Sequence, residues 1–552
     1  MRSPGTTKVP VDSGMGDGGD DGEGVAGDHV GDGNKYRSRS GVEMAEYREG
    51  AEDEDLYAYG QVGNVSSHCC RGLSPTTIVY MSAFVSSLTS VLLGYDVGVI
   101  SGAIKYIQAD FDLNTLQTGV IVSSLNIVAA GGGLLAGSLS DALGRKRSIA
   151  AACLVFITGS LIKVAATSFW VLLLGRIVTG VGVGCGFVVA PVYIAEITPP
   201  HIRGRLTSLT ADLSINLGIV IGYLVAYWVS TTVDGDRTKW KTMLGISIVP
   251  PFIILLSLYL LPESPRWLLG KGQETKAFAV LCMIVTTREM AKKELAEMKI
   301  VAGEEERGNK ASWGELLCSS SPALRSTMVL GVGLGIAQQI SGSEAVVYYS
   351  PSVLNDAGLT SDGEQLAGNV LVGVFKFLGE ICAFVLVDRT GRRPLFISSS
   401  TLVTLFLVML SISFSASPPA PAWVTLTGLC LFMFSFSLGM GALTFLVAAE
   451  IFPLRYRGRG VAMTVSVNRL VSGVVALSFP LLEWALTAGG TFFLFTCLSV
   501  GTVWFYYSKI PETMARTLEE ISAGASKEVS EVDTATVLGF APSAPPGTMN
   551  AI

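Results

Sequence analysis

The sequence predicts an all-α membrane protein with twelve transmembrane helices in two six-helix halves, and three observations lead to this prediction. Hydrophobic residues make up 49% of the 552 residues and charged residues only 15%, against about 25% charged in an ordinary soluble protein, and the mean hydropathy is +0.51. Apolar windows of about 20 residues, the length that crosses a bilayer, recur along the chain. Polar motifs of the first half return in the second half.

Three short motifs occur twice, about 250 residues apart and with the same internal spacing. The pairs are Glu196–Arg205 with Glu450–Arg459, Asp141–Lys146 with Asp388–Arg393, and Pro262–Ser264 with Pro511–Thr513. A soluble solenoid would repeat every 20 to 50 residues or so and would be far less apolar. A duplicated membrane unit is typical of transporters, whose substrate site lies between the halves near the bilayer midplane.

The apolar windows define the predicted helices in chain order. They cover residues 78–100, 118–138, 148–168, 170–194, 209–230, 242–261, 326–350, 366–387, 395–415, 422–449, 461–482 and 491–510. The predicted domains are a tail at 1–74, a six-helix bundle at 75–263, a linker at 264–325, a second six-helix bundle at 326–510 and a tail at 511–552. Helical periodicity with mixed charge around Lys276–Met298 predicts short cytoplasmic helices in the linker.

Basic residues determine the predicted orientation. Clusters that include Arg145 and Arg392 follow the second, fourth, eighth and tenth windows, and positive residues near helix ends stay in the cytoplasm. Both termini and the linker are therefore expected in the cytoplasm, with the plasma membrane as the expected location. The first tail is acidic and poor in large apolar residues, which predicts disorder and argues against a transit peptide.

The nine cysteines have no metal-like spacing and are expected to be small apolar core residues. Cys69 and Cys70 precede the first window directly. They are either palmitoylation sites or plain thiols.

Six motifs together resemble the sugar porter family of the major facilitator superfamily, over about residues 75 to 520. They are Gly94–Ala103, Asp141–Arg147, Pro191–Glu196, Pro262–Arg266, Gln338–Tyr349 and Pro511–Thr513. The resemblance implies the major facilitator fold and transport of a sugar. The stretch Leu88–Ala103 and the Asn468–Arg469 pair are most similar to plant-type polyol and monosaccharide proton symporters.

Seven charged residues are mid-span candidates within the predicted windows. Each costs about 2.5 to 3.5 kcal/mol on insertion scales and is a functional hypothesis by default. They are the acids Asp96, Asp212, Glu344 and Glu380 and the bases Arg176, Lys376 and Arg469. If each base pairs with a carboxylate, one acid is left over to bind a proton, which is what proton coupling needs.

Asp96 is the predicted proton carrier and Arg176 its partner, because the resemblance implies this role for both. A proton on Asp96 would release Arg176 and favour the outward-facing state, and its loss to the cytoplasm would reset the carrier. The alternative is a permanent salt bridge that holds two helices together. The proton is the expected coupling ion, and no metal or organic cofactor is expected.

The expected substrate-binding residues are polar or aromatic and lie within the windows. They are Asp212, Gln338, Gln339, Glu344, Tyr348, Lys376, Phe445 and Asn468. The resemblance implies that Gln338, Gln339 and Tyr348, on a helix interrupted at Gly342, contact sugar hydroxyls, which suits side chains that both donate and accept. Hydrogen bonding between helices is the alternative role for the glutamine pair.

Asp212 and Glu344 stand where hexose carriers of the family commonly have Gln and Asn. Charge-assisted bonds from hydroxyls to carboxylates are strong, which favours a flexible open-chain polyol. Alternatively, these acids pair with Lys376 and Arg469 as structural bridges. Lys376 and Glu380 are four residues apart and can also form an ion pair.

Two residues depart from the family pattern in the window 422–449. Ala442 and Phe445 stand where the family usually has a proline and a tryptophan. Phe445 keeps an apolar face for the C–H surface of a sugar but lacks the indole N–H donor. Without the proline, the helix is expected to be stiffer.

The repeated polar motifs predict a cytoplasmic gate made of ion pairs. Its expected members are Asp141, Arg145, Glu196, Arg203, Glu263, Asp388, Arg392, Glu450 and Arg457. Exposed pairs worth about 0 to 1 kcal/mol can break and reform during alternating access. Retention of topology by positive charge is a compatible role.

Together these features predict a proton-coupled symporter of a polyol or monosaccharide that acts as a monomer in a lipid bilayer and binds no nucleic acid. The alternatives are a proton-independent carrier of hexose or inositol and a transporter-like nutrient sensor that signals through its tails. An enzyme is not expected, because the buried polar groups form no nucleophile, metal or phosphate site.

Overall fold

The computed structural model describes residues 74–199, 212–307, 313–317, 321–417, 420–453 and 455–512. These ranges are helices and short connections, without a strand. The predicted tail at 1–74, apart from Ser74, lies outside the described residues, as do Cys69, Cys70 and Arg203. So does the predicted tail at 511–552 beyond Glu512.

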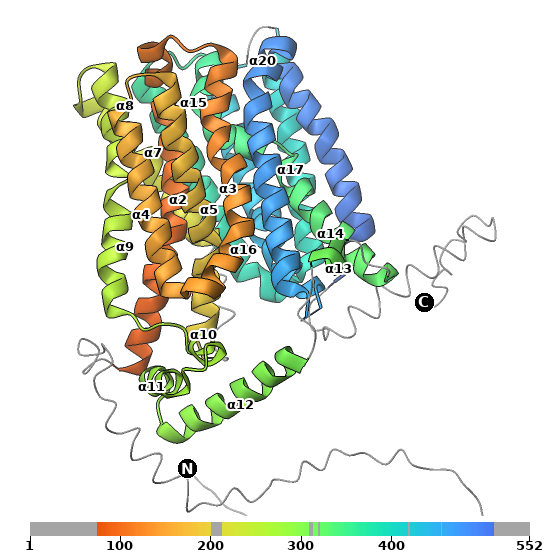
Figure 1. The fold of residues 1–552 in the computed structure, drawn as a ribbon. Coiled ribbons are helices and arrows are strands. Elements are labelled where there is room, and N and C mark those ends of the chain that lie inside the picture. Colours follow the sequence, from red (N-terminus) through yellow and green to blue (C-terminus); the bar gives the residue numbers. More distant parts are fainter. Residues whose placement is uncertain are drawn as a thin grey trace, which may run out of the picture. The chain divides into compact units, whose positions relative to one another are not determined.

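The helices before residue 261 form what we call the N-terminal group. They are α2 (Pro75–Phe111), α3 (Thr115–Leu143), α4 (Arg145–Ala165), α5 (Phe169–Ile197), α7 (Ser214–Thr232), α8 (Asp236–Ile246) and α9 (Val249–Leu260). Four short helices follow, α10 (Pro265–Gly270), α11 (Glu274–Ile284), α12 (Arg288–Arg307) and α13 (Trp313–Leu317). The predicted helical stretch Lys276–Met298 falls on α11 and α12. Figure 1 shows α10, α11 and α12 near one end of the long helices.

The helices after residue 321 form the C-terminal group. They are α14 (Pro322–Gln339), α15 (Ser343–Asp356), α16 (Asp362–Thr390), α17 (Arg392–Ser415), α18 (Ala422–Phe436), the π-helical turn η2 (Ser437–Gly441), α19 (Ala442–Ile451) and α20 (Arg457–Lys509). Ten stretches among the described residues are long and apolar enough to cross a membrane.

Two places depart from one helix per predicted window. The window 326–350 falls on α14 and α15, because the chain breaks before Gly342, whose φ of 82° lies in the left-handed region that glycine tolerates. The windows 461–482 and 491–510 both fall on α20, which is interrupted at Thr487, where φ is 65° and ψ is 167°.

Capping residues determine where several helices begin. The Ser74 hydroxyl accepts a hydrogen bond from the amide of Thr77 (3.2 Å), and proline follows it at the first helical position. Asn114 and Gln117 form a reciprocal capping box at the start of α3, with bonds of 2.8 and 3.1 Å.

Glycines spaced four residues apart allow α2 and α7 to pack backbone to backbone. A Cβ atom on Gly94 would lie 1.9 Å from the carbonyl oxygen of Ile215, and one on Gly218 would lie 2.2 Å from that of Val91. Such small-residue stripes bring helices close inside a membrane, where no water drives their association. This contact places Asp96 of α2 in the interior of the bundle, where it has no exposed surface.

The outer surface of the bundle carries large apolar side chains. Trp170, Tyr259, Trp484 and Phe84 are between 65% and 84% exposed. A water-soluble protein rarely exposes so many such side chains around its circumference. The surface therefore suits contact with lipid, and the polar chemistry lies inside.

Candidate functional site

A polar cavity lies where helices of both groups meet. Its lining is Leu93, Val97, Asp212, Ile215, Asn216, Ile219, Gln338, Gln339, Glu344, Lys376, Glu380, Phe436, Gly441, Phe445 and Arg469. Six of the eight expected substrate-binding residues belong to this lining, whereas Tyr348 and Asn468 do not. The cavity volume is about 50 Å³, room for one or two water molecules. A larger solute can therefore enter only when the surrounding helices move apart.

Asn468 lies behind the two glutamines and connects them. Its amide donates to Gln338 Oε1 (2.5 Å), and its oxygen accepts from Gln339 Nε2 (3.2 Å). The Gln338 amide donates to the carbonyl oxygens of Met440 and Gly441 (2.9 and 3.0 Å). Gln338 and Asn468 thus hold α14 against η2 and α20, which is the interhelical role considered as the alternative for the glutamine pair.

Gln339 and Glu344 present acceptor atoms that the protein leaves without partners. Gln339 Oε1 and Glu344 Oε2 are buried and have no hydrogen-bond partner among the described residues. Both residues line the cavity. A buried polar atom without a partner costs about 1 to 3 kcal/mol, and hydroxyl donors of a bound solute would satisfy both atoms.

The remaining charges around the cavity are only loosely paired. The closest contact of Arg469 with Glu344 is 3.9 Å, and Arg469 donates to Asn468 Oδ1 at 2.9 Å. The charge of Asp212 is opposed at longer range by Arg469 and Lys376. The structure therefore brings these acids and bases together around the cavity, with Glu344 and Arg469 as a long ion pair.

Lys376 and Glu380 both line the cavity from one face of α16. Among the described residues they form no direct ion pair: the Lys376 amine lies over the Phe436 ring, 5.1 Å from its centroid. Glu380 instead accepts a hydrogen bond from the Asn216 amide at 3.0 Å. The expected pair is therefore replaced by a contact from Glu380 to α7 of the other helix group.

Tyr348 is fully buried away from the cavity. Its hydroxyl accepts from the Asn126 amide (3.0 Å), which also donates to Ser472 Oγ (2.8 Å). These bonds join α15, α3 and α20. In this structure Tyr348 connects the two helix groups, and Asn126 is a buried polar residue that sequence reasoning missed.

The helix that lacks the family's proline is nevertheless interrupted. Between α18 and α19 the turn η2 is π-helical, directly before Ala442. Gly439 lies within η2, where a Cβ atom would approach the Leu395 carbonyl oxygen to 2.5 Å. A π-helical turn departs from regular α-helical geometry and is often found at functional sites, and the expected stiffening stays a prediction. Phe445 follows one turn later and packs edge-on against Phe187 of α5.

Asp96 and Arg176 are fully buried and form an ion pair, with Arg176 Nη1 2.5 Å from Asp96 Oδ2. A third residue completes this ion cluster: Lys163 of α4, also fully buried, pairs with Asp96 Oδ1. The expectation of one surplus acid was therefore wrong. With Lys163 added to the seven mid-span residues, there are four acids and four bases.

The position of Lys163 explains why it was missed. It lies in the last turn of α4, where a lysine commonly extends its amine to the membrane surface. Close packing of α4 on α5 prevents this, because a Cβ atom on Gly175 would lie 2.8 Å from Lys163 Cγ. A lysine inside the window 148–168 was the available signal.

The repeated motifs lie at the end of the bundle where α4 and α17 begin. Arg145 contacts Glu196 (2.9 Å) and Asp141 (3.1 Å), and Arg392 contacts Glu450 at 3.3 Å. Arg457 Nε donates to the carbonyl oxygen of Phe452 (3.4 Å). Two expected gate members are outside this description: Arg203 as a whole and the side chain of Asp388.

Glu263 and Glu512 each cap a helix. Glu263 accepts from the backbone amides of Arg145 and Lys146 (2.9 and 3.1 Å), and Glu512 accepts from those of Arg392 and Arg393 (3.1 and 3.0 Å). Carboxylates at helix N-termini satisfy free amides and complement the helix dipole. Each glutamate thus closes the start of α4 or α17, where a glycine with φ of 96° or 85° precedes the helix.

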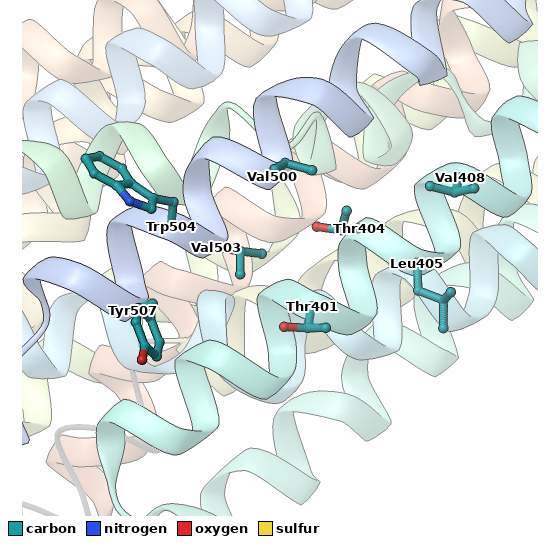
Figure 2. A pocket seen from close by; sticks show the side chains of 8 residues that line it. All are labelled: Thr401, Thr404, Leu405, Val408, Val500, Val503, Trp504 and Tyr507. Atoms are coloured by element: carbon teal, nitrogen blue, oxygen red, sulfur yellow. The ribbon is translucent and has the colours of Figure 1, made fainter. Parts of the chain in front are cut away.

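An apolar groove on the outer surface lies apart from this chemistry. It runs between α17 and α20, and its lining is Thr401, Thr404, Leu405, Val408, Val500, Val503, Trp504 and Tyr507 (Figure 2). It contains no charged side chain, and Leu405, Trp504 and Tyr507 are each more than half exposed. The groove therefore belongs to the lipid-facing surface.

Membrane-length helices around a polar interior cavity are typical of a transporter for a polar solute, because polar groups at membrane depth commonly mark a solute pathway. Within the described residues no group of three or more His, Cys, Asp or Glu side chains could hold a metal ion. The family model for sugar (and other) transporters matches residues 82–524. The chain belongs to this family and is a multi-pass membrane protein.

Relatives in sequence are polyol and sugar carriers. The chain is 39% identical to "Probable polyol transporter 4" of Arabidopsis thaliana over 462 residues, which cover 82% of this chain and 87% of the relative. It is 37% identical to "Polyol transporter 5" of the same plant, over 80% of this chain and 85% of the relative. It is 34% identical to "Glucose transporter GlcP" of Staphylococcus epidermidis, over 80% of this chain and 96% of the relative.

Solved structures of a bacterial transporter share the fold. The proton:xylose symporter XylE bound to 6-bromo-6-deoxy-D-glucose matches with a TM-score of 0.69 and 27% identity, over 81% of this chain and 99% of that chain. A partially occluded inward open conformation of XylE from E. coli matches with a TM-score of 0.70 and 26% identity, over 80% and 100%. These relatives are transporters and not enzymes.

Proposed function

We propose that this chain is a proton-coupled symporter of a polyol or monosaccharide that works by alternating access. Two observations carry the proposal. The cavity contains buried acceptor atoms of Gln339 and Glu344 that have no partner among the described residues, and the separate ion cluster around Asp96 is fully buried. The first set of groups suits a polyhydroxylated solute, and the second offers a site for a coupled proton. The named polyol transporters and the proton symporter XylE support both parts.

Twelve transmembrane helices in two six-helix halves are supported by the helix breaks. The pair α14–α15 supplies one span in addition to the ten stretches of sufficient length, and the turn at Thr487 divides α20 into two. The linker helices α10–α13 separate six spans from six. Basic repeats at one end of the bundle favour a cytoplasmic location for that end and for both termini. The plasma membrane is the location that we propose.

Within this mechanism the cavity residues take two roles. Asp212, Gln339, Glu344 and Lys376 would contact the substrate, and Phe445 would cover its C–H surface. Gln338 and Asn468 would hold the helices that form the cavity. An open-chain polyol can turn several hydroxyl donors toward the acids, whereas a ring sugar has fixed hydroxyl directions, so we propose a polyol as the preferred substrate.

The two ends of the bundle would open alternately. At one end Arg145, Glu196, Arg392 and Glu450 form the ion pairs described above, within each helix group. At the other end Lys105 of α2 contacts Asp362 of α16 at 2.5 Å and so joins the two groups. As part of the proposal, the transporter works as a monomer, with helices of both groups of one chain around the cavity.

The test is electrical recording from voltage-clamped oocytes that express the protein. Sorbitol, mannitol, xylitol, myo-inositol, glucose and xylose are applied at acidic and neutral external pH, with labelled uptake measured in parallel. We expect an inward current that grows at acidic pH, largest for an open-chain polyol. Uptake without current would instead identify a proton-independent carrier. Neither uptake nor current from protein at the cell surface would contradict transport of these solutes and favour a nutrient sensor.

A further inference from the structure

The ion cluster around Asp96 contains one acid and two bases, all without exposed surface. Arg176 cannot give up its proton in a protein, and its other two nitrogens are also bonded: Nε and Nη2 donate to the carbonyl oxygens of Ile121 and Val122, each at 3.1 Å. Arg176 is therefore a fixed cation. Any change of protonation must occur on Asp96 or Lys163.

Charge counting decides between these two groups. With all three residues ionised the cluster has a net charge of +1, and loss of the Lys163 proton brings it to zero. Protonation of Asp96 would instead leave Lys163 and Arg176 as two adjacent cations without a carboxylate. An unpaired buried charge is strongly destabilising, so proton exchange costs less free energy at Lys163 than at Asp96.

The surroundings of Lys163 contain no other group that could take this proton. The charges that act on it are Asp96 of α2 and Arg176 of α5. The Phe156 ring of α4 lies 5.4 Å from its amine. The nearby phenol of Tyr95 donates to the carbonyl oxygen of Met243 in α8, and among the described residues α3 and α9 place no charged side chain against the cluster.

We propose that Lys163 carries the coupled proton while Asp96 stays ionised, an inference that rests on the proposed proton symport. The neutral amine of Lys163 takes a proton from hydronium on the outside, which leaves water and an ammonium paired with Asp96. The ammonium later returns the proton to water on the cytoplasmic side. Lys163 is 18 residues from Arg145 along α4, about 27 Å at 1.5 Å per residue, so the cluster is close to the end opposite the cytoplasmic repeats.

The experiment compares wild type with Lys163→Met and Lys163→Arg in oocytes, with surface expression measured by biotinylation. Methionine has a similar length and no charge, so Asp96 and Arg176 remain a neutral pair. We expect Lys163→Met to lose the substrate-evoked current but to retain counterflow of labelled substrate, at a rate independent of external pH. Arginine keeps the ion pair with Asp96 yet cannot release a proton, so Lys163→Arg should also lose the current. If Lys163→Met does not reach the cell surface, Lys163→Arg provides the test.

The outcomes separate the inference from the function on which it rests. A substrate-evoked current with wild-type pH dependence in either variant would overturn the role of Lys163 and return the proton to Asp96, with symport intact. Loss of counterflow along with current, in a variant at the cell surface, would make Lys163 a structural residue and also overturn the inference. Uptake without current in wild type would overturn proton symport and the inference together.

Discussion

At the scale of single residues, two glutamines that are adjacent in the sequence have different roles at the cavity. Gln338 uses its amide on the π-helical turn and its oxygen on Asn468, whereas Gln339 keeps a buried oxygen without a partner among the described residues. Helical periodicity alone could not distinguish them, because the difference arises from η2 and α20, which come about 100 residues later in the chain.

Replacement of Gln339 by leucine should weaken substrate binding. The variant loses one acceptor worth about 1 to 2 kcal/mol, so we expect the KM of uptake to rise by about 5- to 30-fold with a smaller change in maximal rate. Concentration dependence of labelled polyol uptake measures this. Thr401→Val, in the groove of Figure 2, is the control and should leave KM unchanged. An unchanged KM for Gln339→Leu would remove Gln339 from the substrate site.

At the scale of elements, the break between α14 and α15 depends on one glycine. Gly342 has φ of 82°, and a Cβ atom there would lie 2.9 Å from the Phe495 ring. Gln339 precedes the break and Glu344 follows it, and both line the same cavity.

Gly342→Ala should therefore destabilise the fold and impair transport. A left-handed conformation costs a residue with a Cβ atom about 1 to 3 kcal/mol, and the contact with Phe495 adds to this. We expect a lower midpoint of thermal unfolding in detergent and reduced uptake. Gly137→Ala in α3, where a Cβ atom meets nothing within 4 Å, is the matched control. Equal midpoints for both variants would contradict the importance of the break.

The two capping glutamates are a second feature at this scale. Glu263 is an expected gate member and Glu512 lies in the matching repeat, yet each accepts bonds from two backbone amides at the start of a helix. The dipeptides Pro262–Glu263 and Pro511–Glu512 thus serve stability in a way that their charge pattern does not reveal.

Glu263→Ala and Glu512→Ala should each lower thermal stability. Loss of a helix cap costs about 0.5 to 2 kcal/mol, and the two effects should add within about 0.5 kcal/mol if the caps act independently. Thermal unfolding of the single and double variants in detergent measures this. Full stability of both single variants would favour a role in gating alone.

At the scale of the whole molecule, polar contacts between the two helix groups hold the structure in one arrangement. The Lys105–Asp362 pair is one of these contacts, and both side chains are about half exposed. An exposed pair is worth about 0 to 1 kcal/mol, which is small enough to break in each transport cycle and large enough to shift a balanced equilibrium by several-fold.

Lys105→Gln should shift the protein toward the state that is open at this end. We expect labelling of a cysteine introduced at Leu366, which is 4% exposed, to accelerate by up to about fivefold. Arg237→Gln is the matched control, because Arg237 pairs with Asp110 at the same end (3.1 Å) but within the N-terminal group. Equal labelling rates in wild type and Lys105→Gln would show that this contact does not hold the end closed.

The sequence by itself determined the membrane class, the sugar transporter family, the helix break at Gly342 and six of the fifteen residues that line the cavity. These features depend on composition, local backbone preferences and short motifs, which act within one or two helical turns. Only the tertiary structure decided the partners: Lys163 for Asp96, Asn216 for Glu380, Asn126 for Tyr348 and a helix start for each capping glutamate. The physical reason is that a buried polar group must find its partner on another helix, and helix packing, not sequence spacing, determines which group that is.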